Sequence, residues 1–337
     1  MTQVQAQAPI LSLRDVSKRF FAKQRLLGQL MGESPRCVHA LNGIDLDVHG
    51  GETLGIVGES GCGKSTLARC LVRLLEPDTG TITFEGQSIG DLKRARQRTF
   101  NRRVQMIFQD PYSSLNPRMT VRQILKEALS VHKIRPKDRI DARIAELMEI
   151  VRLPADAVDR YPREFSGGQR QRIGIARALS VEPEILIADE LVSALDVSVQ
   201  AQVINLLLQL QDELKLTIIF VAHDLRLVRH ISHRVAVMYL GRIVEIAPTE
   251  DLFTAPRHPY SKALLDAAPD LDPAKRRRGA AARGELPSPF DIPPGCPFNT
   301  RCAHATQDCR RLLPALTPRS KDHMAACHKV DFGADAA

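Results

Sequence analysis

The sequence predicts an α/β protein: a largely parallel sheet covered by helices, with an inserted helical subdomain and a small Cys-containing C-terminal module. Two observations predict this fold. From about Ile10 to Leu252, apolar runs of strand length alternate with amphipathic segments of helical period. After Leu252 prolines accumulate, and four of the seven cysteines lie in the last part of the chain.

Five segments have the short, apolar and β-branched composition of buried parallel strands. They are 53–57, 104–108, 185–188, 217–222 and 234–239. Between the second and the third, residues 116–179 have helical periodicity without a convincing strand. We therefore expect a main domain over 1–255, with a helical subdomain at about 112–180, and a linker with a C-terminal domain over 256–337.

Composition and charge exclude several classes of protein. With 337 residues, 44% hydrophobic and 26% charged, the chain has the composition of a water-soluble globular protein with a packed core. The net charge of +8 permits an anionic partner without showing one. The sequence contains neither a signal peptide at its start nor an apolar run long enough for a spanning helix. We therefore expect a cytosolic protein with mostly reduced or metal-bound cysteines.

A phosphate-binding loop follows the first of these strands. Residues 58–65 read Gly-Glu-Ser-Gly-Cys-Gly-Lys-Ser, and a helix is predicted from Thr66 to Leu75. Glycines let backbone N–H groups turn toward phosphate oxygens, Lys64 reaches the β and γ phosphates, and the Ser65 hydroxyl ligates Mg²⁺. The strand and helix on either side make a chance glycine-rich turn the minor alternative. The substrate is expected to be a nucleoside triphosphate with magnesium.

Two carboxylates end the strand at 185–188. Asp189 is placed to hold magnesium through its water shell, and Glu190 to polarise the attacking water. Taken alone, an Asp-Glu pair after a strand is as often a solvated turn. About twenty residues earlier, Ser166-Gly167-Gly168-Gln169 opens a helix-like run and forms a second anion-binding cap.

Two further motifs follow in order, Ser193-Ala194-Leu195-Asp196 and Val221-Ala222-His223-Asp224. With this set of motifs, the chain resembles the ATP-binding subunits of ABC transporters over nearly its whole length. The resemblance implies the P-loop NTPase fold of an ABC ATPase and two subunits that sandwich two ATP molecules. Its implied catalytic residues are Glu190, His223, Lys64 and Gln109. The implied ATP contacts are Phe20 (or, as the weaker alternative, Phe21), Gly58, Glu59, Ser60, Gly61, Cys62, Gly63, Lys64, Ser65, Thr66, Gln109, Asp189 and His223 from one subunit, and Ser166, Gly167, Gly168, Gln169 and Asp196 from the other. Magnesium would be bound through Ser65, Gln109 and Asp189.

Within that family the chain is similar to importer ATPases of the dipeptide and oligopeptide group. The likeness is carried by residues 109–118 (Gln-Asp-Pro-Tyr-Ser-Ser-Leu-Asn-Pro-Arg), Tyr161-Pro162, His258-Pro259-Tyr260 and Gly284-Glu285-Leu286-Pro287-Ser288-Pro289. Relatives that handle nickel or other solutes share much of this pattern, because separate chains choose the solute. One departure is Leu191, which follows Glu190 where the family has Pro; the turn is less constrained, and we expect altered turnover with the site retained.

The cysteines of the tail suggest a metal or a covalent staple. Cys296, Cys302, Cys309 and Cys327 have the spacing C-x5-C-x6-C-x17-C, which lacks the close pairs of zinc ribbons. The resemblance implies a [4Fe-4S] cluster on these four thiolates. Zinc, with His304 or His328 as further ligands, and four unliganded thiols remain the alternatives. No chemical role is assigned to Cys37, Cys62 or Cys70. Cys62 is included among the ATP contacts only because it lies in the phosphate loop.

The resemblance also implies the partners and the location. These are a second ABC ATPase, which is expected to be a sibling chain, two membrane permease subunits and an extracytoplasmic solute-binding protein. The chain would lie peripherally on the cytoplasmic face of the inner membrane. An alternative is a soluble ABC-type ATPase that acts on nucleic acid or ribosomes. The basic run Lys275–Arg278 lacks the interleaved aromatic residues of a nucleic-acid platform, so no nucleic acid is expected.

Overall fold

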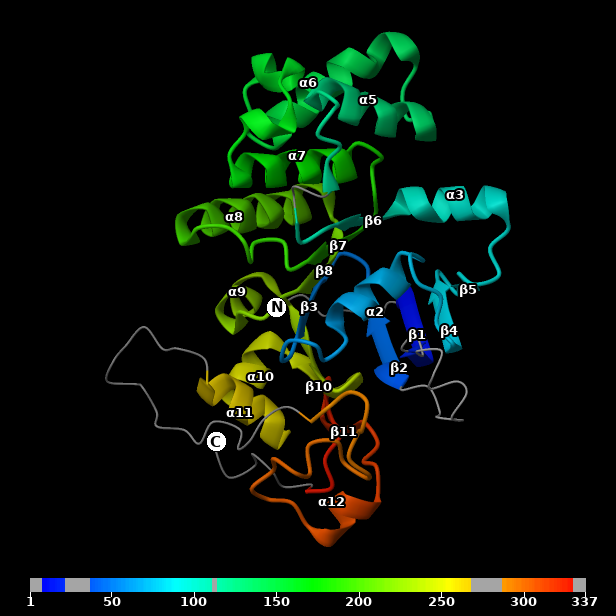
Figure 1. Ribbon diagram of the computed structural model, residues 1–337, viewed down its shortest axis with the longest axis vertical. Helices are drawn as coiled ribbons and strands as arrows, with labels where there is room; N and C mark the ends of the chain where they lie inside the picture. The colour runs from blue at the N-terminus through cyan, green and yellow to red at the C-terminus, as the bar shows by residue number, and fades with distance from the viewer. Residues whose placement is uncertain (1–7, 22–36, 111–113, 268–286, 330–337) are drawn as a thin grey trace, which may run out of the picture. The chain divides into compact units, whose positions relative to one another are not determined.

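A computed structural model describes residues 8–21, 37–110, 114–267 and 287–329 (Figure 1). The chain forms two compact units. Their described parts lie within residues 49–53 and 91–222 for the first unit, and within 8–48, 54–90 and 223–329 for the second. The predicted linker with its basic run Lys275–Arg278, and residues 111–113 of the peptide-importer pattern, lie outside the described residues.

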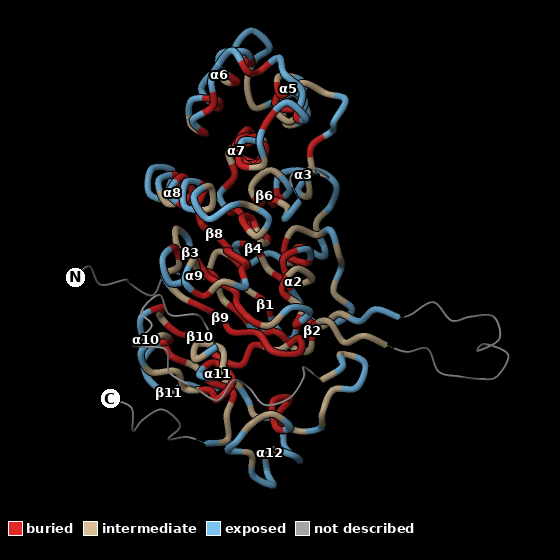
Figure 2. Tube along the Cα trace, turned by 60° about the vertical axis from the view of Figure 1, so that its left-hand side comes forward, coloured by how far each residue is buried: buried red, intermediate tan, exposed pale blue. Residues whose placement is uncertain are grey.

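The first unit contains a parallel sheet of β6 (Val104–Ile107), β7 (Ile185–Asp189) and β8 (Thr217–Val221), in the order β8-β7-β6. Every residue of β7 and β8 is buried, and Figure 2 shows β8 within the buried interior. Strands buried on both faces are uniformly apolar, which is why the sequence identified all three to within one or two residues.

Helices make up the rest of the first unit. They are α3 (Arg94–Arg103), α5 (Val121–His132), α6 (Ile140–Ile150), α7 (Gly167–Leu179) and α8 (Val197–Leu214), with 3-10 turns at 137–139, 155–159 and 162–164. Helices α5 and α6 lie beside α7 (Figure 1). Thr120 begins α5 with a capping box, and the α5 residues Ile124, Leu125 and Leu129 bury one face. Residues 116–179 contain no strand, as predicted.

The second unit contains two sheets. In one, β3 (Thr53–Val57) pairs in parallel with β9 (Arg234–Tyr239), and the antiparallel strands β10 (Arg242–Pro248), β12 (His323–Ala325) and β11 (Thr317–Ser320) follow. The other is antiparallel, in the order β2-β1-β4-β5: β2 (Cys37–Val48), β1 (Leu11–Phe21), β4 (Thr79–Phe84) and β5 (Gln87–Ser88). The prediction of one largely parallel sheet missed this second sheet, because its half-exposed strands have no continuous apolar run.

Short helices complete the second unit. They are α2 (Lys64–Leu71), α9 (Leu225–Ile231), α10 (Thr249–Thr254), α11 (Pro259–Ala267) and α12 (Gln307–Arg311). Of these, α2 follows the phosphate loop directly after β3, which is the predicted order of strand, loop and helix.

A buried carboxylate joins the C-terminal module to the main sheet. Glu245, on β10, has no exposed surface; it accepts hydrogen bonds from the backbone N–H groups of Arg257 (2.5 Å) and His258 (3.0 Å). His323 Nε2 lies 2.7 Å from the same carboxylate. Because β12 also pairs with β10, with Ala325 opposite Glu245, the module continues the sheet.

Replacing Glu245 by Ala is expected to lower the free energy of unfolding by about 3–5 kcal/mol, because three partners, two of them buried, lose their acceptor. Chemical denaturation followed by circular dichroism measures this. Exposed Glu149 on α6 provides the control, and its replacement by Ala should change stability by no more than about 0.5 kcal/mol. Equal stability of the two variants would contradict the assigned role of Glu245.

Candidate functional site

The phosphate loop has a backbone shape that only glycine permits at two positions. Gly58 has φ 153°, and a Cβ there would lie 2.2 Å from the Met238 carbonyl oxygen. Gly63 caps α2 with φ 108°, and a Cβ there would lie 2.3 Å from the Ala40 carbonyl oxygen. The loop therefore packs closely on the strands beneath it, and its N–H groups and the start of α2 can face an anion.

Lys64 is held against the same loop. Its Nζ donates to the carbonyl oxygens of Gly58 (2.7 Å) and Glu59 (3.0 Å), and the side chain is 4% exposed. Ser60 and Gly61 are exposed at the tip, and Ser65 and Thr66 are half-buried in the first turn of α2. A cation and a helix N-terminus at one place favour a phosphate group.

Cys62 is buried within the loop and its Sγ lies 3.9 Å from Lys64 Nζ. Burial raises the pKa of this thiol, although Lys64 opposes the rise. The thiol therefore stays protonated and is a packing residue, not a nucleophile.

The aromatic residues at the end of β1 are exposed. Phe20 is 39% and Phe21 65% exposed, and Lys18 Nζ lies 5.8 Å from the centre of the Phe20 ring. Lys18 also pairs with Asp78 at 2.7 Å. Phe20 thus has a free ring surface on which a base could stack.

His223 is exposed and lies directly before α9. Its neighbour Asp224 caps that helix, and its side chain accepts from the backbone N–H of Arg226 at 2.9 Å. The Arg226 side chain pairs with the same carboxylate at 2.8 Å and lowers its pKa. This cap fixes the backbone from which the imidazole of His223 extends.

In the first unit, the structure brings together two residues that the sequence places 81 positions apart. Gln109 Nε2 donates to Glu190 Oε2 at 2.6 Å. Asp189, 3% exposed, ends β7, and the next residue, Glu190, has φ 46° and donates its N–H to the Val221 carbonyl at 2.9 Å. Leu191 is buried, so an apolar side chain takes the place where the family pattern has Pro.

The predicted helix cap at Ser166 is present. Its Oγ accepts from the Gln169 N–H (3.3 Å), and the Gln169 side chain accepts from the Ser166 N–H (2.9 Å), which is a full capping box on α7. The next helix, α8, begins after the exposed residue Asp196. The remaining N–H groups at the start of α7 can bind an anion.

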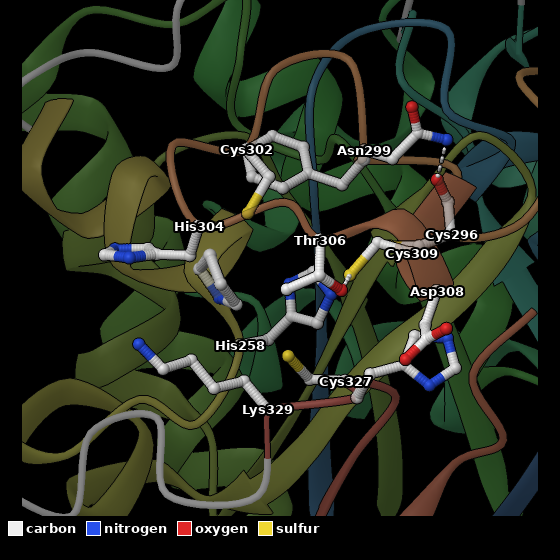
Figure 3. A pocket seen from close by; sticks show the side chains of 13 residues that line it. His258, Cys296, Asn299, Cys302, His304, Thr306, Asp308, Cys309, Cys327 and Lys329 are labelled. Carbon is white, nitrogen blue, oxygen red and sulfur yellow. Dashed lines mark hydrogen bonds between the residues drawn. The ribbon is translucent and has the colours of Figure 1, made fainter. Parts of the chain in front are cut away.

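The four cysteines of the tail line one cavity of about 350 Å³, together with His304 and His328. The sulfur atoms of Cys302, Cys309 and Cys327 point into it (Figure 3). Burial raises the pKa of Cys296 to about 11. The described residues nevertheless include no group of three or more His, Cys, Asp or Glu side chains placed to hold a metal ion, so neither the predicted cluster nor zinc is confirmed.

Two residues that contact the phosphate loop were not identified from the sequence. The Tyr260 hydroxyl accepts from the Glu59 N–H at 2.9 Å, and Arg301 Nη1 donates to both carboxylate oxygens of Glu59 at 2.9 and 3.0 Å. Tyr260 belongs to the His258-Pro259-Tyr260 pattern, which does not indicate a contact with the loop. No spacing rule connects residues 201 and 242 positions apart, so only the fold could reveal these contacts.

Together, the phosphate loop, the capped helix at Ser166 and the carboxylates that end β7 define a P-loop nucleotide-binding protein. Residues 41–193 match the family model described as ABC transporter, and residues 244–309 match that described as oligopeptide/dipeptide transporter, C-terminal region. The oligopeptide transport ATP-binding protein AppF of Bacillus subtilis (strain 168) is 48% identical over 329 residues, which are 96% of this chain and 98% of AppF.

Solved structures agree with this class. The ATP-binding cassette MJ0796, in a dimeric post-hydrolysis state with ADP and Pi, aligns with a TM-score of 0.62 and 25% identity over 71% of this chain and 98% of its own. CbiO1 of Clostridium perfringens, part of the ABC transporter complex cbiONQ, aligns with a TM-score of 0.61 and 29% identity over 73% and 91%. The chain belongs to the ABC transporter family, in the group of ATP-binding proteins with an oligopeptide/dipeptide-type C-terminal region.

Among the helices that the structure describes, none has the length and apolar composition needed to cross a membrane.

Two glycines of α7 differ in the space that an added Cβ would find. A Cβ on Gly168 would lie 2.2 Å from Val199 Cγ1, whereas a Cβ on Gly174 has its nearest neighbour, Ile107 Cγ2, at 4.0 Å. Gly168→Ala is therefore expected to lower stability by about 1–3 kcal/mol, and Gly174→Ala to raise it by about 0.5–1 kcal/mol. Thermal unfolding of the two variants beside the parent tests this, and a stabilising Gly168→Ala would contradict the packing described at the capped end of α7.

Proposed function

We propose that this chain hydrolyses ATP as the energising subunit of an ABC importer for dipeptides or oligopeptides. The observation that carries the proposal is the hydrogen bond between Gln109 and Glu190, because it orients a carboxylate that follows a buried Asp at a strand end. If Asp189 and Glu190 formed only a solvated turn after the strand, no hydrogen bond from Gln109 to the Glu190 carboxylate would be needed. The family match supports the transporter context over an ATPase that acts on nucleic acid or ribosomes.

The proposed roles follow from the chemistry of each group. The loop 58–63, Lys64 and the Ser65–Thr66 pair bind the phosphates, and Phe20 stacks on the adenine. Mg²⁺ would be held by Ser65, Gln109 and Asp189, where it would neutralise charge on the transferred phosphoryl group.

Hydrolysis needs a base that takes a proton from the attacking water. Glu190 is proposed as that base, with Gln109 orienting its carboxylate and His223 contacting the γ-phosphate. From a second subunit, the cap at Ser166, Gly167, Gly168 and Gln169, together with Asp196, would contact the same γ-phosphate and the water near it. A site shared in this way binds ATP tightly only when two subunits close, and loses its cross-subunit contacts after hydrolysis.

The proposed partners follow from that cycle. They are a second ABC ATPase, preferably a sibling chain, two membrane permease subunits and an extracytoplasmic solute-binding protein. The chain would lie peripherally on the cytoplasmic face of the inner membrane. The helical subdomain is proposed to move when the dimer closes and to shift the permeases from one access state to the other.

Glu190→Gln is expected to lower the ATPase rate of the assembled transporter by about 10²–10⁴-fold, because the amide cannot accept the proton, while MgATP binding is retained. Size-exclusion chromatography with MgATP should show the variant trapped as a closed dimer. Glu213→Gln, at an exposed position on α8, is the matched control and should hydrolyse ATP at the parental rate. If Glu190→Gln also hydrolyses ATP at that rate, the base is another group.

We further propose that the cysteine cavity holds a [4Fe-4S] cluster. Thiolates are the ligands that such clusters take, and four cysteines line one cavity of about 350 Å³. The spacing C-x5-C-x6-C-x17-C lacks the close pairs of zinc ribbons, which favours the cluster over zinc. A bound metal would also keep these thiols deprotonated, against the burial that now raises their pKa.

Chain purified without oxygen is expected to contain about four iron and four sulfide per molecule, with broad visible absorption. Cys302→Ser should lose most of the iron, and Cys37→Ser, which lies on β2 outside the cavity, should retain it. Stoichiometric zinc without iron would contradict the cluster and support a zinc site. Absence of both metals would contradict both and indicate that the four thiols are unliganded.

A further inference from the structure

Glu59 of the phosphate loop contacts both α11 and the C-terminal module. Its backbone N–H donates to the Tyr260 hydroxyl, and its carboxylate accepts twice from Arg301 Nη1. Its carbonyl oxygen accepts from Lys64 Nζ at 3.0 Å. Three groups of Glu59 are thus occupied by residues from α11, the C-terminal module and α2, so Glu59 has little freedom to turn.

The ion pair between Arg301 and Glu59 is shielded from water. The side chain of Arg301 is only 8% exposed and that of Glu59 27%. The guanidinium lies 5.8 Å from the ring centre of Tyr239 and 5.9 Å from that of Phe298. Shielded, hydrogen-bonded pairs of this kind contribute more than exposed ones, and removing one partner leaves a buried charge.

The aromatic rings around this pair form a continuous cluster. Tyr239 and Tyr260 have ring centres 4.6 Å apart, and Phe298 lies 5.3 Å from the first and 5.4 Å from the second. Phe298 and Arg301 belong to the same segment of the module, 296–302. These packed rings therefore connect the segment 296–302 to Tyr260. Tyr260 in turn contacts the phosphate loop at Glu59.

The segment 296–302 also carries two of the cysteines that line the cavity. The N–H groups of Arg301 and Cys302 both donate to the Phe298 carbonyl, each at 3.0 Å, and Cys296 N–H donates to the Cys309 carbonyl at 2.8 Å. Asn299 closes the turn by donating to the carbonyl of Cys296 (Figure 3). Arg301 therefore lies on the same hydrogen-bonded turn as two of the cysteines that line the cavity.

We propose that Arg301 is a positioning residue for the ATP site and that it transmits the state of the cysteine cavity to the affinity for MgATP. Glu59, held by Arg301 and Tyr260, keeps its carbonyl on Lys64, so that the ammonium stays beside the loop where the phosphates bind. The inference rests on the proposed ATP-binding function of the loop. By linkage, MgATP and the contents of the cavity then influence each other's binding equally.

The test measures MgATP affinity of the full-length chain by competition with a fluorescent ATP analogue. Arg301→Met keeps the packing against Tyr239 and Phe298 but removes the charge; Glu59→Gln removes the other charge. Each is expected to weaken MgATP binding by about tenfold, and the double variant by no more than either one, because both remove the same interaction. Arg301→Lys should restore part of the affinity.

Two results would overturn the positioning role. One is MgATP affinity within about twofold of the parent in both single variants, and the other is single effects that multiply in the double variant. A merely structural role of Arg301 lowers the thermal unfolding temperature without nucleotide and leaves affinity unchanged. Arg310→Met, at an exposed position on α12 of the same module, is the control and should bind as the parent does.

The link to the cavity has its own test. Cys302→Ser is expected to weaken MgATP binding in the parent and to have no further effect in Arg301→Met. No effect in either background, or the same effect in both, would overturn this link. Lys64→Met separates failure of the proposed function from failure of the inference: if parent and Lys64→Met bind MgATP equally, the loop is not the ATP site at all.

Discussion

The phosphate loop can exist only where its backbone lies directly against neighbouring strands. At Gly58 and Gly63 a methyl group would meet carbonyl oxygens at 2.2 and 2.3 Å, and backbone cannot yield as a flexible side chain can. The loop is therefore fixed by the strands that supply those oxygens: the end of β9, at Met238, and β2, at Ala40. Its shape therefore depends on chain segments both before and long after it.

Features set by residues close together in the sequence could be predicted from it, whereas contacts between distant residues could not. The loop, the helix cap at Ser166 and the buried strands are local patterns, and the structure has the loop between its strand and helix, a helix that begins after Ser166, and the strands to within one or two residues. The antiparallel sheet of β1, β2, β4 and β5 was missed, because half-exposed strands lack a continuous apolar run. The contacts of Glu59 with Tyr260 and Arg301 leave no local signal, because the partners are far apart in the sequence and no spacing pattern joins them.

The arrangement of the four cysteines in the tail was predictable from the sequence only in part. Spacing in a short, proline-rich segment suggested shared ligands, and the fold does place all four cysteines around one cavity. Spacing could not show how the fold arranges the four side chains. Their placement depends on the turn at 296–302 and on the hairpin of β11 and β12, neither of which the sequence identified.

The hairpin also explains why the module is not an independent appendage. Strand β12 pairs with β10, β10 with β9, and β9 with β3, which runs directly into the phosphate loop. Glu245, buried opposite Ala325, binds His323 and the N–H groups before α11, the helix that carries Tyr260. The module therefore meets the loop by two routes, one through sheet hydrogen bonds and one through Arg301. Sheet pairing resists deformation, whereas the Arg301 contact depends on the orientation of one side chain. Of the two, the side-chain route is the one through which the proposed effect of the cavity on the loop would act.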